Sequence, residues 1–560
     1  MKLKLVGLLF CFCVGVAEAK IGLTSTIARE GGATPDFPNI VFFFVDDMGW
    51  QDTSVPFYTE KTSLNQRYHT PNMALLARQG MKFTQAYASA VCSPSRVSLM
   101  TGMNAARHRV TNWTLNKDVS PDIENPVVEP PKWNVNGLSP DPSVPYTVTA
   151  KTLPSLMKEA GYRTIHVGKA HFGAKGTPGE EPLNLGFDIN IGGHAAGGPG
   201  SYLGIHKFSA DWRDPGNHIW DIPGLASYHG QEIYLTEALT REALKEISKS
   251  VETEQPFYLY MSHYAIHAPW ENDERYCHKY IAQGLSEDEA TYASMIEGMD
   301  KSLGDIMEHL EQLGVADNTI IVFMSDNGVH KQMPQNKPLR GHKLSPYEGG
   351  IRVPLLVKWP GVVSPQTVND EYVIIEDIFP TFLEMAGLRK YAQKSVDGKS
   401  FVHKLKGKTS SRQRPLLWHY PNTYYNPPYS VVRLGGWKLI YHHQDQRMEL
   451  FNINKDIGET TDLSKVEEAK TKEMADLMTK LLKDTKAQMP IIKATGERVP
   501  FPSELTLSSY VHQSLLRSGS PSKPVDRQLF WGSSSSRYPL GQTMPILNAS
   551  TGFNQKNLTR

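Results

Sequence analysis

The sequence predicts an α/β protein with a large, mixed but mostly parallel sheet flanked by helices, and a small antiparallel sheet with a helix near its carboxyl end. Two observations lead to this prediction. Up to about residue 387, short uninterrupted apolar runs alternate with amphipathic stretches of helical period, as in strands buried on both faces of a parallel sheet. Beyond about residue 408 the runs are paired across glycines, which is typical of hairpins.

The first predicted strand is the apolar run Asn39–Val45, which ends at Asp46 and Asp47. Pro71–Gly80 predicts a short amphipathic helix, and a second strand is expected around Phe83. Asp46 and Asp47 are adjacent acids on a predicted turn, and such acids commonly only solvate a loop or cap a helix. These two, however, follow a buried strand, at the edge where open α/β sheets bind ligands. Their carboxylate oxygens suit Ca²⁺ or Mg²⁺.

Strands and helices then alternate along the chain. The further predicted strands are Thr164–Val167, Phe257–Met261, Thr319–Met324 and Pro354–Val357. The further predicted helices are Thr152–Ala160, the stretch from Met295 to Leu313, and Asp377–Ala386. Apolar residues between 295 and 313 recur every three or four positions, which indicates core packing and not a cofactor site.

The predicted antiparallel part begins with a hairpin. Ser430–Leu434 and Trp437–Tyr441 flank Gly435-Gly436, Glu449–Asn452 adds a strand, and Val466–Leu482 has the pattern of an amphipathic helix. From about residue 490 proline and serine dominate. We therefore expect an extended or partly disordered tail over 490–560.

Residues 1–19 have the features of a signal peptide. Lys2 and Lys4 precede an apolar run, and Ala17-Glu18-Ala19 supplies the small residues of a cleavage site. Cleavage after Ala19 predicts a periplasmic or secreted protein with no membrane attachment, because no internal run is long enough to span a bilayer. The formal charge falls from +1 to zero on cleavage, so no nucleic-acid or membrane partner is expected.

Cleavage also leaves two cysteines, Cys92 and Cys277, which either stay free or form one disulfide. Cys92 opens the stretch Cys92-Ser93-Pro94-Ser95-Arg96, and Leu99-Met100-Thr101-Gly102 follows. The plain interpretation is a free cysteine that caps an ordinary helix. A helix from about Pro94 would also place Cys92 at a helix N-terminus, where free N–H groups favour an anion such as sulfate.

Cys-x-Pro-x-Arg followed by Leu-x-Thr-Gly resembles the signature of the type I sulfatases, which belong to the alkaline phosphatase superfamily. In that family the cysteine is oxidised to formylglycine (3-oxoalanine), whose hydrated aldehyde is the nucleophile. The resemblance implies an alkaline-phosphatase-like fold, Cys92 as the modified nucleophile, and Arg96 reaching the formylglycine oxygens. It also implies a formylglycine-generating or sulfatase-maturing enzyme as a partner.

Three later motifs resemble the same family, in the same order. In Gly168-Lys169-Ala170-His171-Phe172-Gly173 the resemblance implies that Lys169 contacts formylglycine and sulfate and that His171 holds formylglycine. His267 in His-x-Pro, and Lys343 before Glu-Gly-Gly-x-Arg-x-Pro, resemble sulfate-binding residues. Taken singly, each of these is an ordinary loop residue.

Asp326-Asn327-Gly328 follows its predicted strand as Asp46 and Asp47 follow theirs. Asp-Asn-Gly alone is a common turn. With the two earlier acids it resembles the family's calcium ligands. The resemblance implies one Ca²⁺ per chain, in preference to Mg²⁺, on Asp46, Asp47, Asp326, Asn327 and the modified Cys92.

The resemblance extends roughly from Asn39 to Leu463 and implies hydrolysis of sulfate esters with release of inorganic sulfate. Together with the sequence patterns above, it divides the chain into a signal peptide (1–19), a catalytic domain (20–407), a C-terminal subdomain (408–489) and a tail (490–560). Lys169, Lys343, Arg96 and His267 would supply positive charge. Either His267 or Lys343 would protonate the leaving oxygen.

Scattered aromatic residues and proline-rich loops in a secreted chain suggest a sulfated carbohydrate as substrate, either an algal polysaccharide such as ulvan or carrageenan or a glycosaminoglycan fragment. Trp113 and Trp133 flank the proline-rich stretch 116–146, where they either stack on sugar rings or simply pack. Three alternatives stay open. They are an arylsulfatase acting on small aromatic sulfates, a phosphoryl hydrolase of the same superfamily, and a non-catalytic carbohydrate-binding protein.

Overall fold

The computed structural model describes residues 37–391, 395–409 and 413–505. The predicted signal peptide and the predicted tail beyond residue 505 lie outside this range. The described residues fall within one compact unit. The predicted boundary at residue 408 falls on the connection between α11 (Val402–Leu405) and β11 (Leu416–Tyr420).

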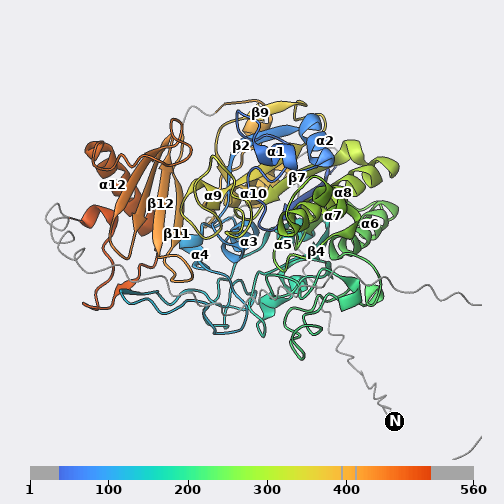
Figure 1. Ribbon diagram of the computed structural model, residues 1–560, viewed down its shortest axis with the longest axis horizontal. Coiled ribbons are helices and arrows are strands. Elements are labelled where there is room, and N and C mark those ends of the chain that lie inside the picture. The colour runs from blue at the N-terminus through green and yellow to red at the C-terminus, as the bar shows by residue number, and fades with distance from the viewer. Residues whose placement is uncertain (1–36, 392–394, 410–412, 506–560) are drawn as a thin grey trace, which may run out of the picture. The chain divides into compact units, whose positions relative to one another are not determined.

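A nine-stranded sheet organises the fold (Figure 1). Its strands are β1 (Asn39–Val45), β2 (Met81–Tyr87), β4 (Arg163–Gly168), β5 (Ile189–Ile191), β6 (Phe257–Ser262), β7 (Thr319–Ser325), β8 (Arg352–Lys358), β9 (Thr367–Asn369) and β10 (Val373–Ile374). Their order is β10-β2-β8-β7-β1-β6-β4-β5, with β9 also paired to β2. Only β8 runs antiparallel to its neighbours among these strands, which confirms the predicted mixed, mostly parallel sheet.

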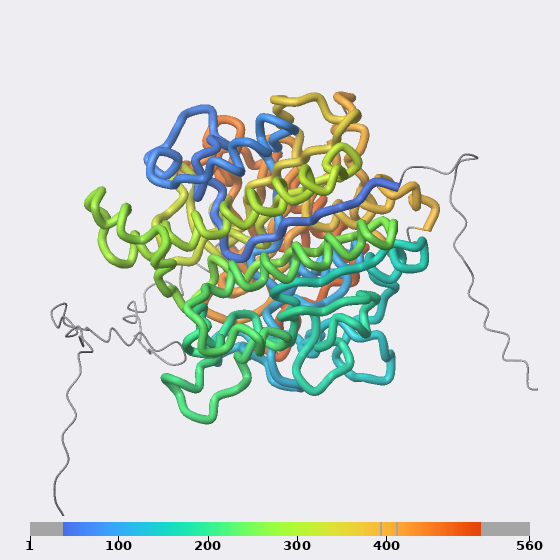
Figure 2. The backbone as a smooth tube through the Cα atoms, turned by 90° about the vertical axis from the view of Figure 1, so that its right-hand side faces the viewer, coloured from blue at the N-terminus to red at the C-terminus, as the bar shows by residue number. Residues whose placement is uncertain are grey.

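The central strand β1 runs through the middle of the molecule (Figure 2) and is buried on both faces. Ile40, Phe42 and Phe44 enter one core and Val41 and Phe43 the other, as the period of two in a strand requires. The first core includes residues of α3 (Cys92–Thr101), α5 (Leu153–Glu159) and α10 (Ile378–Met385). The second includes residues of α2 (Pro71–Gln79), α6 (Leu235–Glu252), α7 (Glu274–Ala282) and α8 (Glu287–Gln312).

The predicted helices α2, α5, α8 and α10 are confirmed, whereas α6 and α7 were not predicted. In α6, Leu235, Leu239, Ala243 and Ile247 are buried at every fourth position, a pattern that was present in the sequence. The shorter helices are α1 (Ser63–Arg67), α4 (Ala105–His108) and α9 (Glu348–Ile351).

A separate four-stranded antiparallel sheet has the order β11-β12-β13-β14. It contains the predicted hairpin, β12 (Tyr429–Leu434) and β13 (Trp437–His442), the predicted strand β14 (Met448–Asn452), and the unpredicted β11. One face packs on the predicted helix, α12 (Glu468–Asp484), and the other joins a core of the large sheet. The first residues of the predicted tail are paired, since β15 (Ile491–Ile492) pairs with β3 (Val128–Glu129).

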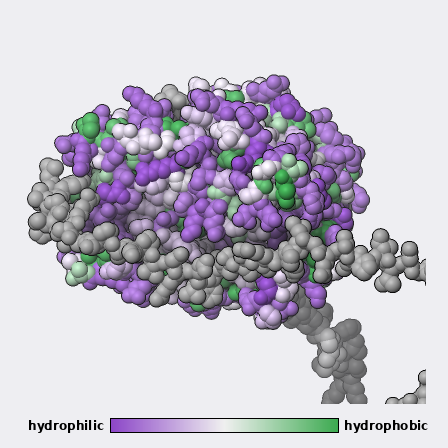
Figure 3. All heavy atoms as spheres, in the orientation of Figure 1, coloured by the Kyte–Doolittle hydropathy of each residue, from purple (hydrophilic) through white to green (hydrophobic). Residues whose placement is uncertain are grey.

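Cys92 and Cys277 are both free and buried, and they pack in different cores. The alternative of a disulfide between them is therefore wrong for this structure. Within the described ranges no helix has the length and apolar character of a membrane span. The face drawn in Figure 3 is mostly hydrophilic, with hydrophobic residues in small separate groups.

Candidate active site

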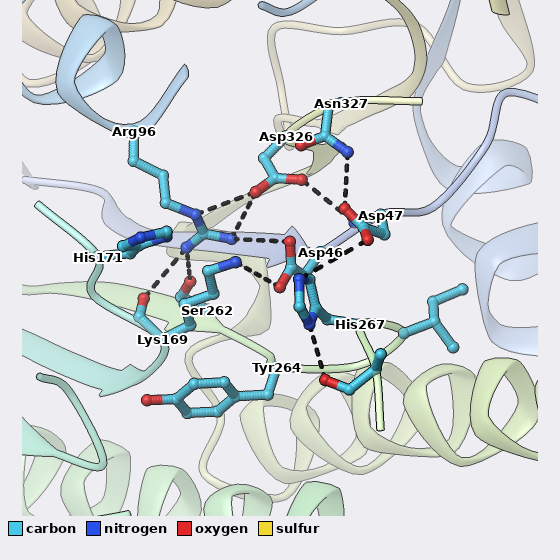
Figure 4. Close-up of polar contacts among 12 residues, drawn as sticks. Asp46, Asp47, Arg96, Lys169, His171, Ser262, Tyr264, His267, Asp326 and Asn327 are labelled. Carbon is cyan, nitrogen blue, oxygen red and sulfur yellow. Dashed lines mark hydrogen bonds and ion pairs between the residues drawn. The ribbon is translucent and has the colours of Figure 1, made fainter. Parts of the chain in front are cut away.

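The predicted site residues meet where the parallel strands end, and Figure 4 shows them apart from Cys92 and Lys343. This is where loops leave an open α/β sheet and ligands bind. Asp46 and Asp47 follow β1, Asp326 and Asn327 follow β7, Lys169 and His171 follow β4, His267 follows β6, Cys92 and Arg96 lie on α3, and Lys343 precedes α9. Residues more than 200 positions apart in the chain thus share one site.

Three carboxylates form the buried centre of this site. Asp46, Asp47 and Asp326 each offer an oxygen, and these oxygens lie within 4.8 Å of one another. None of the three side chains is more than 2% exposed. Burial, and next the Asp326 carboxylate, raise the pKa of Asp46, because like charges repel strongly when water is excluded.

Each carboxylate has its own basic partner. Lys169 Nζ donates to Asp46 Oδ2 at 2.6 Å, and Lys343 Nζ donates to Asp47 Oδ1 at 2.6 Å. Arg96 donates through Nε and Nη2 to Asp326 Oδ2, at 3.0 and 2.9 Å. The carboxylate cluster is therefore balanced in formal charge by three cations.

The guanidinium of Arg96 is more fully engaged with protein atoms than the sequence predicted. Besides Asp326, it donates through Nη1 to Ser262 Oγ at 2.7 Å and to the carbonyl oxygen of Lys169 at 3.1 Å. It also lies 5.0 Å from the centre of the Phe44 ring. Arg96 thus ties the end of β7 to the ends of β4 and β6, although the Cys92 side chain lies within range of its charge.

Among the oxygens of Asp46, Asp47, Asp326 and Asn327, two are buried and have no hydrogen-bond partner in the described part of the chain: Asp46 Oδ1 and Asn327 Oδ1. Arg96 Nη2 lies 3.8 Å from Asp46 Oδ1, beyond hydrogen-bond distance. Asn327 directs its Nδ2 to Asp47 Oδ1 at 2.8 Å, which leaves its carbonyl oxygen unpaired. Buried acceptors of this kind are costly unless satisfied, and a carboxylate–amide oxygen set suits a hard divalent cation. The residues therefore fit a hard divalent metal ion.

The two site histidines are held by backbone carbonyls. His171 Nε2 donates to Thr114 O at 2.7 Å, and His267 Nδ1 donates to Ala268 O at 2.7 Å. A carbonyl only accepts, so these contacts fix which nitrogen carries the proton. His267 Nε2 lies 4.0 Å from Asp47 Oδ2. Burial lowers the pKa of both rings, that of His267 to about 3.

The glycine-rich segment after β5 forms a wall against these histidines. A Cβ at Gly197 would lie 2.4 Å from the His171 ring, and one at Gly198 would lie 2.9 Å from the His267 ring. A larger residue at either position would require the neighbouring histidine to shift, so glycine at both positions allows this close approach.

Cys92 is the first residue of α3, where no side chain caps the free N–H groups of the first turn. Burial raises the pKa of its thiol, while the charges of Lys169 and Lys343 oppose the rise. The next residue, Ser93, accepts from the backbone N–H of Thr114 at 3.2 Å. Cys92 thus lies beside the charged cluster at a helix end that favours anions.

Ser262 and His330 also border the site, and neither was predicted. Ser262 ends β6 and accepts from Arg96, so its position at a strand end was the only signal. His330 lies three residues after Asn327 and packs at 5.2 Å against Trp270. Burial lowers the pKa of His330 to about 4, which the Asp47 charge opposes.

The sequence model of the family described as "Sulfatase" matches residues 38–388, which is more than half of the chain. The chain belongs to the sulfatase family. It is therefore a sulfuric ester hydrolase with the alkaline-phosphatase-like sulfatase fold, as the motifs predicted. A second model, "N-sulphoglucosamine sulphohydrolase, C-terminal", matches residues 342–488 of this sulfatase.

Relatives and solved structures agree with this assignment. The "Sulfatase" of Formosa agariphila is 29% identical over 536 residues, covering 85% of this chain and 94% of the relative. The "N-acetylgalactosamine-6-sulfatase" of Sus scrofa is 30% identical over 508 residues, covering 87% and 88%. The crystal structure of Ps i-CgsB in complex with k-i-k-neocarrahexaose is 27% identical, with a TM-score of 0.65, and covers 86% of this chain and 97% of its own.

Proposed function

We propose that this sulfatase hydrolyses sulfate esters of a carbohydrate, using an oxidised Cys92 as nucleophile and one Ca²⁺, and releases inorganic sulfate. The observation that carries the proposal is the balanced buried cluster of three carboxylates and three basic side chains beside Cys92. A divalent cation added to this cluster would leave an excess of two positive charges. Such an excess is what an anionic sulfate ester requires.

The substrate class is supported by what similar proteins are named for. One relative is named for N-acetylgalactosamine 6-sulfate, and one similar structure holds a neocarrahexaose. Both an algal polysaccharide and a glycosaminoglycan fragment remain in the proposal, with small aryl sulfates as the alternative. The predicted signal peptide supports action in the periplasm or outside the cell.

The chain's own residues divide the chemistry as follows. The hydrated aldehyde made from Cys92 supplies one hydroxyl to attack sulfur and a second to expel sulfate afterwards, which a serine or a thiol lacks. Lys169 and Lys343 face the sulfonate oxygens, and Arg96 holds Asp326 in place. His171 Nδ1, with its Nε2 proton directed to Thr114, is left to accept a hydrogen bond from the nucleophile.

A proton must also reach the leaving oxygen. Lys343 carries protons on Nζ, whereas the N–H of the neutral His267 ring is directed to the Ala268 carbonyl. Lys343 is therefore the better donor of the two in this geometry. His267 would then orient the ester.

Ca²⁺ would be held by Asp46, Asp47, Asp326, Asn327 and the oxidised Cys92. When bound there it would polarise the nucleophile's hydroxyl and a sulfate oxygen. We expect chelation by EGTA to lower the melting temperature, because a ligand present at 100 times its Kd stabilises by about 2.7 kcal/mol. Ca²⁺ should restore the melting temperature better than Mg²⁺.

Thermal melting with each metal added back measures this effect. Asn327→Ala is the test variant, because it removes one of the proposed metal-binding oxygens without changing the charge of the site. Its Ca²⁺-dependent rise in melting temperature should be smaller. An unchanged melting temperature after chelation, with no metal found by mass spectrometry, would contradict the calcium assignment.

The test of the proposed function combines a mass and an assay. Protein made in a host with sulfatase maturation activity should show the Cys92 peptide at the mass of formylglycine, which also tests for the maturing partner. The same protein should release sulfate from members of a panel of 6-sulfated N-acetylgalactosamine, carrageenan, ulvan and glycosaminoglycan oligosaccharides. A thiol at Cys92 despite a modified control sulfatase would favour the carbohydrate-binding alternative.

A further inference from the structure

A second feature borders the active site. It is the aromatic wall, which we define as Trp113, Tyr424 and Tyr425. The Trp113 and Tyr424 rings lie edge to face at 5.5 Å, and the Tyr424 and Tyr425 rings at 4.4 Å. Tyr425 is 53% exposed, so the outer ring of the wall faces solvent.

Two residues of the aromatic wall, Trp113 and Tyr424, lie close to the active site. Trp113 precedes Thr114, whose carbonyl holds His171 and whose N–H reaches Ser93, next to Cys92. Tyr424 lies within range of the Lys343 charge: burial raises the pKa of Tyr424, and Lys343 opposes that rise. Lys343 is the residue that pairs with Asp47. The wall therefore begins where the sulfate ester would be held.

The wall is also held in a fixed position. Asp122 accepts from the backbone N–H of Thr423 and from Asn422 Nδ2, both at 3.0 Å, and from Trp133 Nε1 at 2.9 Å. Trp133 is therefore a packed residue. Of the two tryptophans that the sequence left open between packing and sugar stacking, Trp133 packs. Tyr425 itself has a φ of 57°, which costs a residue with a side chain some energy. An exposed aromatic ring that is held in such a conformation is available for binding.

One cation lies on the wall. Lys331 Nζ is 4.7 Å from the centre of the Tyr425 ring, and no carboxylate pairs with Lys331 in the described part of the chain. Lys331 comes four residues after Asn327, on the same loop as His330. A flat aromatic surface with an unpaired cation beside it fits a sugar ring that carries an anionic group.

We propose that Trp113, Tyr424 and Tyr425, with Lys331, form a subsite for the sugar next to the one whose sulfate is removed. That sugar would stack on the tyrosines and present a sulfate or a carboxylate to Lys331. The substrate is then an oligosaccharide with a second anionic group, and not an isolated sulfated sugar. This inference rests on the proposed function, because it specifies the substrate of the same site.

The test compares two substrates of different length in each variant. N-acetylgalactosamine 6-sulfate and a chondroitin 6-sulfate tetrasaccharide form one pair, whose neighbouring sugar supplies a carboxylate. Galactose 4-sulfate and a neocarrahexaose form the other, whose neighbouring sugar supplies only sulfate. The measured quantity is kcat/KM for the long substrate divided by that for the short one. The pair that responds identifies the anion.

Tyr425→Ala and Lys331→Ala should each lower this ratio about tenfold for the responding pair, through KM and not kcat. Asp122→Ala should lower it too, because it releases the segment that positions the wall. Lys337→Ala is the matched control, an exposed lysine on the same loop, and should leave the ratio unchanged. Melting temperatures of all four variants show that each is folded.

Two results would overturn the subsite. One is an unchanged ratio in both Tyr425→Ala and Lys331→Ala. The other is a lower ratio in Trp212→Ala alone. Trp212 is an exposed tryptophan outside the aromatic wall, and its ring is stacked at 4.1 Å on that of His206. If the unaltered protein hydrolyses no sulfate ester at all, the proposed function fails instead, so the two failures are distinguishable.

Discussion

Cys92→Ala is expected to lower kcat for sulfate-ester hydrolysis by about 10⁴-fold or more, because it removes the proposed nucleophile and leaves only binding and charge stabilisation. Cys92→Ser should be almost as inactive in turnover, since a serine that accepts the sulfate has no second hydroxyl to expel it. Assays of sulfate release measure the first effect. Mass spectrometry of the Cys92→Ser protein after incubation with substrate should detect the trapped sulfate ester on residue 92.

Cys277→Ala is the matched control, because Cys277 is also a free, buried cysteine but packs on the opposite face of the sheet. It should keep kcat within about twofold and cost no more than about 1–2 kcal/mol of stability, the price of a small cavity. Equal losses of activity in the two alanine variants would show that the Cys92 effect is structural. Activity retained in Cys92→Ala would leave the catalytic proposal without its nucleophile.

The large sheet could be predicted because its strands are buried on both faces and therefore read as plain apolar runs. Asn39–Val45 is predicted to the residue, and Thr319–Met324 to within one. The short edge strands β5, β9 and β10 were missed, since two or three residues carry no period. β11 was missed for a related reason. Its sequence, Leu-Leu-Trp-His-Tyr, lies between prolines and has no turn partner close in the chain.

The candidate site could be predicted only as a set of residues in family order. That Asp46, Asp47, Asp326 and Asn327 meet follows from the parallel pairing of β1 and β7, which the sequence suggested but did not fix. The partners of each charge could not be predicted. Nothing local tells that Lys169 reaches Asp46 or that Ser262 holds Arg96, because these contacts depend on the register of β4 and β6. The aromatic wall could not be predicted for the same reason, because Trp113 and Tyr424 come from different parts of the fold.

Arg96→Met should have the largest combined effect on stability and activity. Arg96 is fully buried and provides both hydrogen bonds to Asp326 Oδ2, so its removal leaves a buried carboxylate without its cation. Breaking a buried pair from one side typically costs about 3–5 kcal/mol. Because Asp326 would also shift, kcat should fall by about 10²–10³-fold in whatever fraction folds. Arg96→Lys should recover little, since a lysine cannot reproduce the planar fork that serves Asp326, Ser262 and a carbonyl together.

Arg433→Met is the control that separates the loss of stability from the loss of kcat. Arg433 is the other fully buried arginine among the largest buried side chains, but it hydrogen-bonds to Tyr87, Gln85 and the Gly435 carbonyl, away from the carboxylate cluster. Its loss should destabilise by about 1–3 kcal/mol and leave kcat near that of the unaltered enzyme at temperatures where it stays folded. Denaturant unfolding and sulfate release on the same samples measure both quantities. If Arg96→Met kept kcat within tenfold, Arg96 would be a structural arginine like Arg433, and the site would not depend on how Asp326 is held.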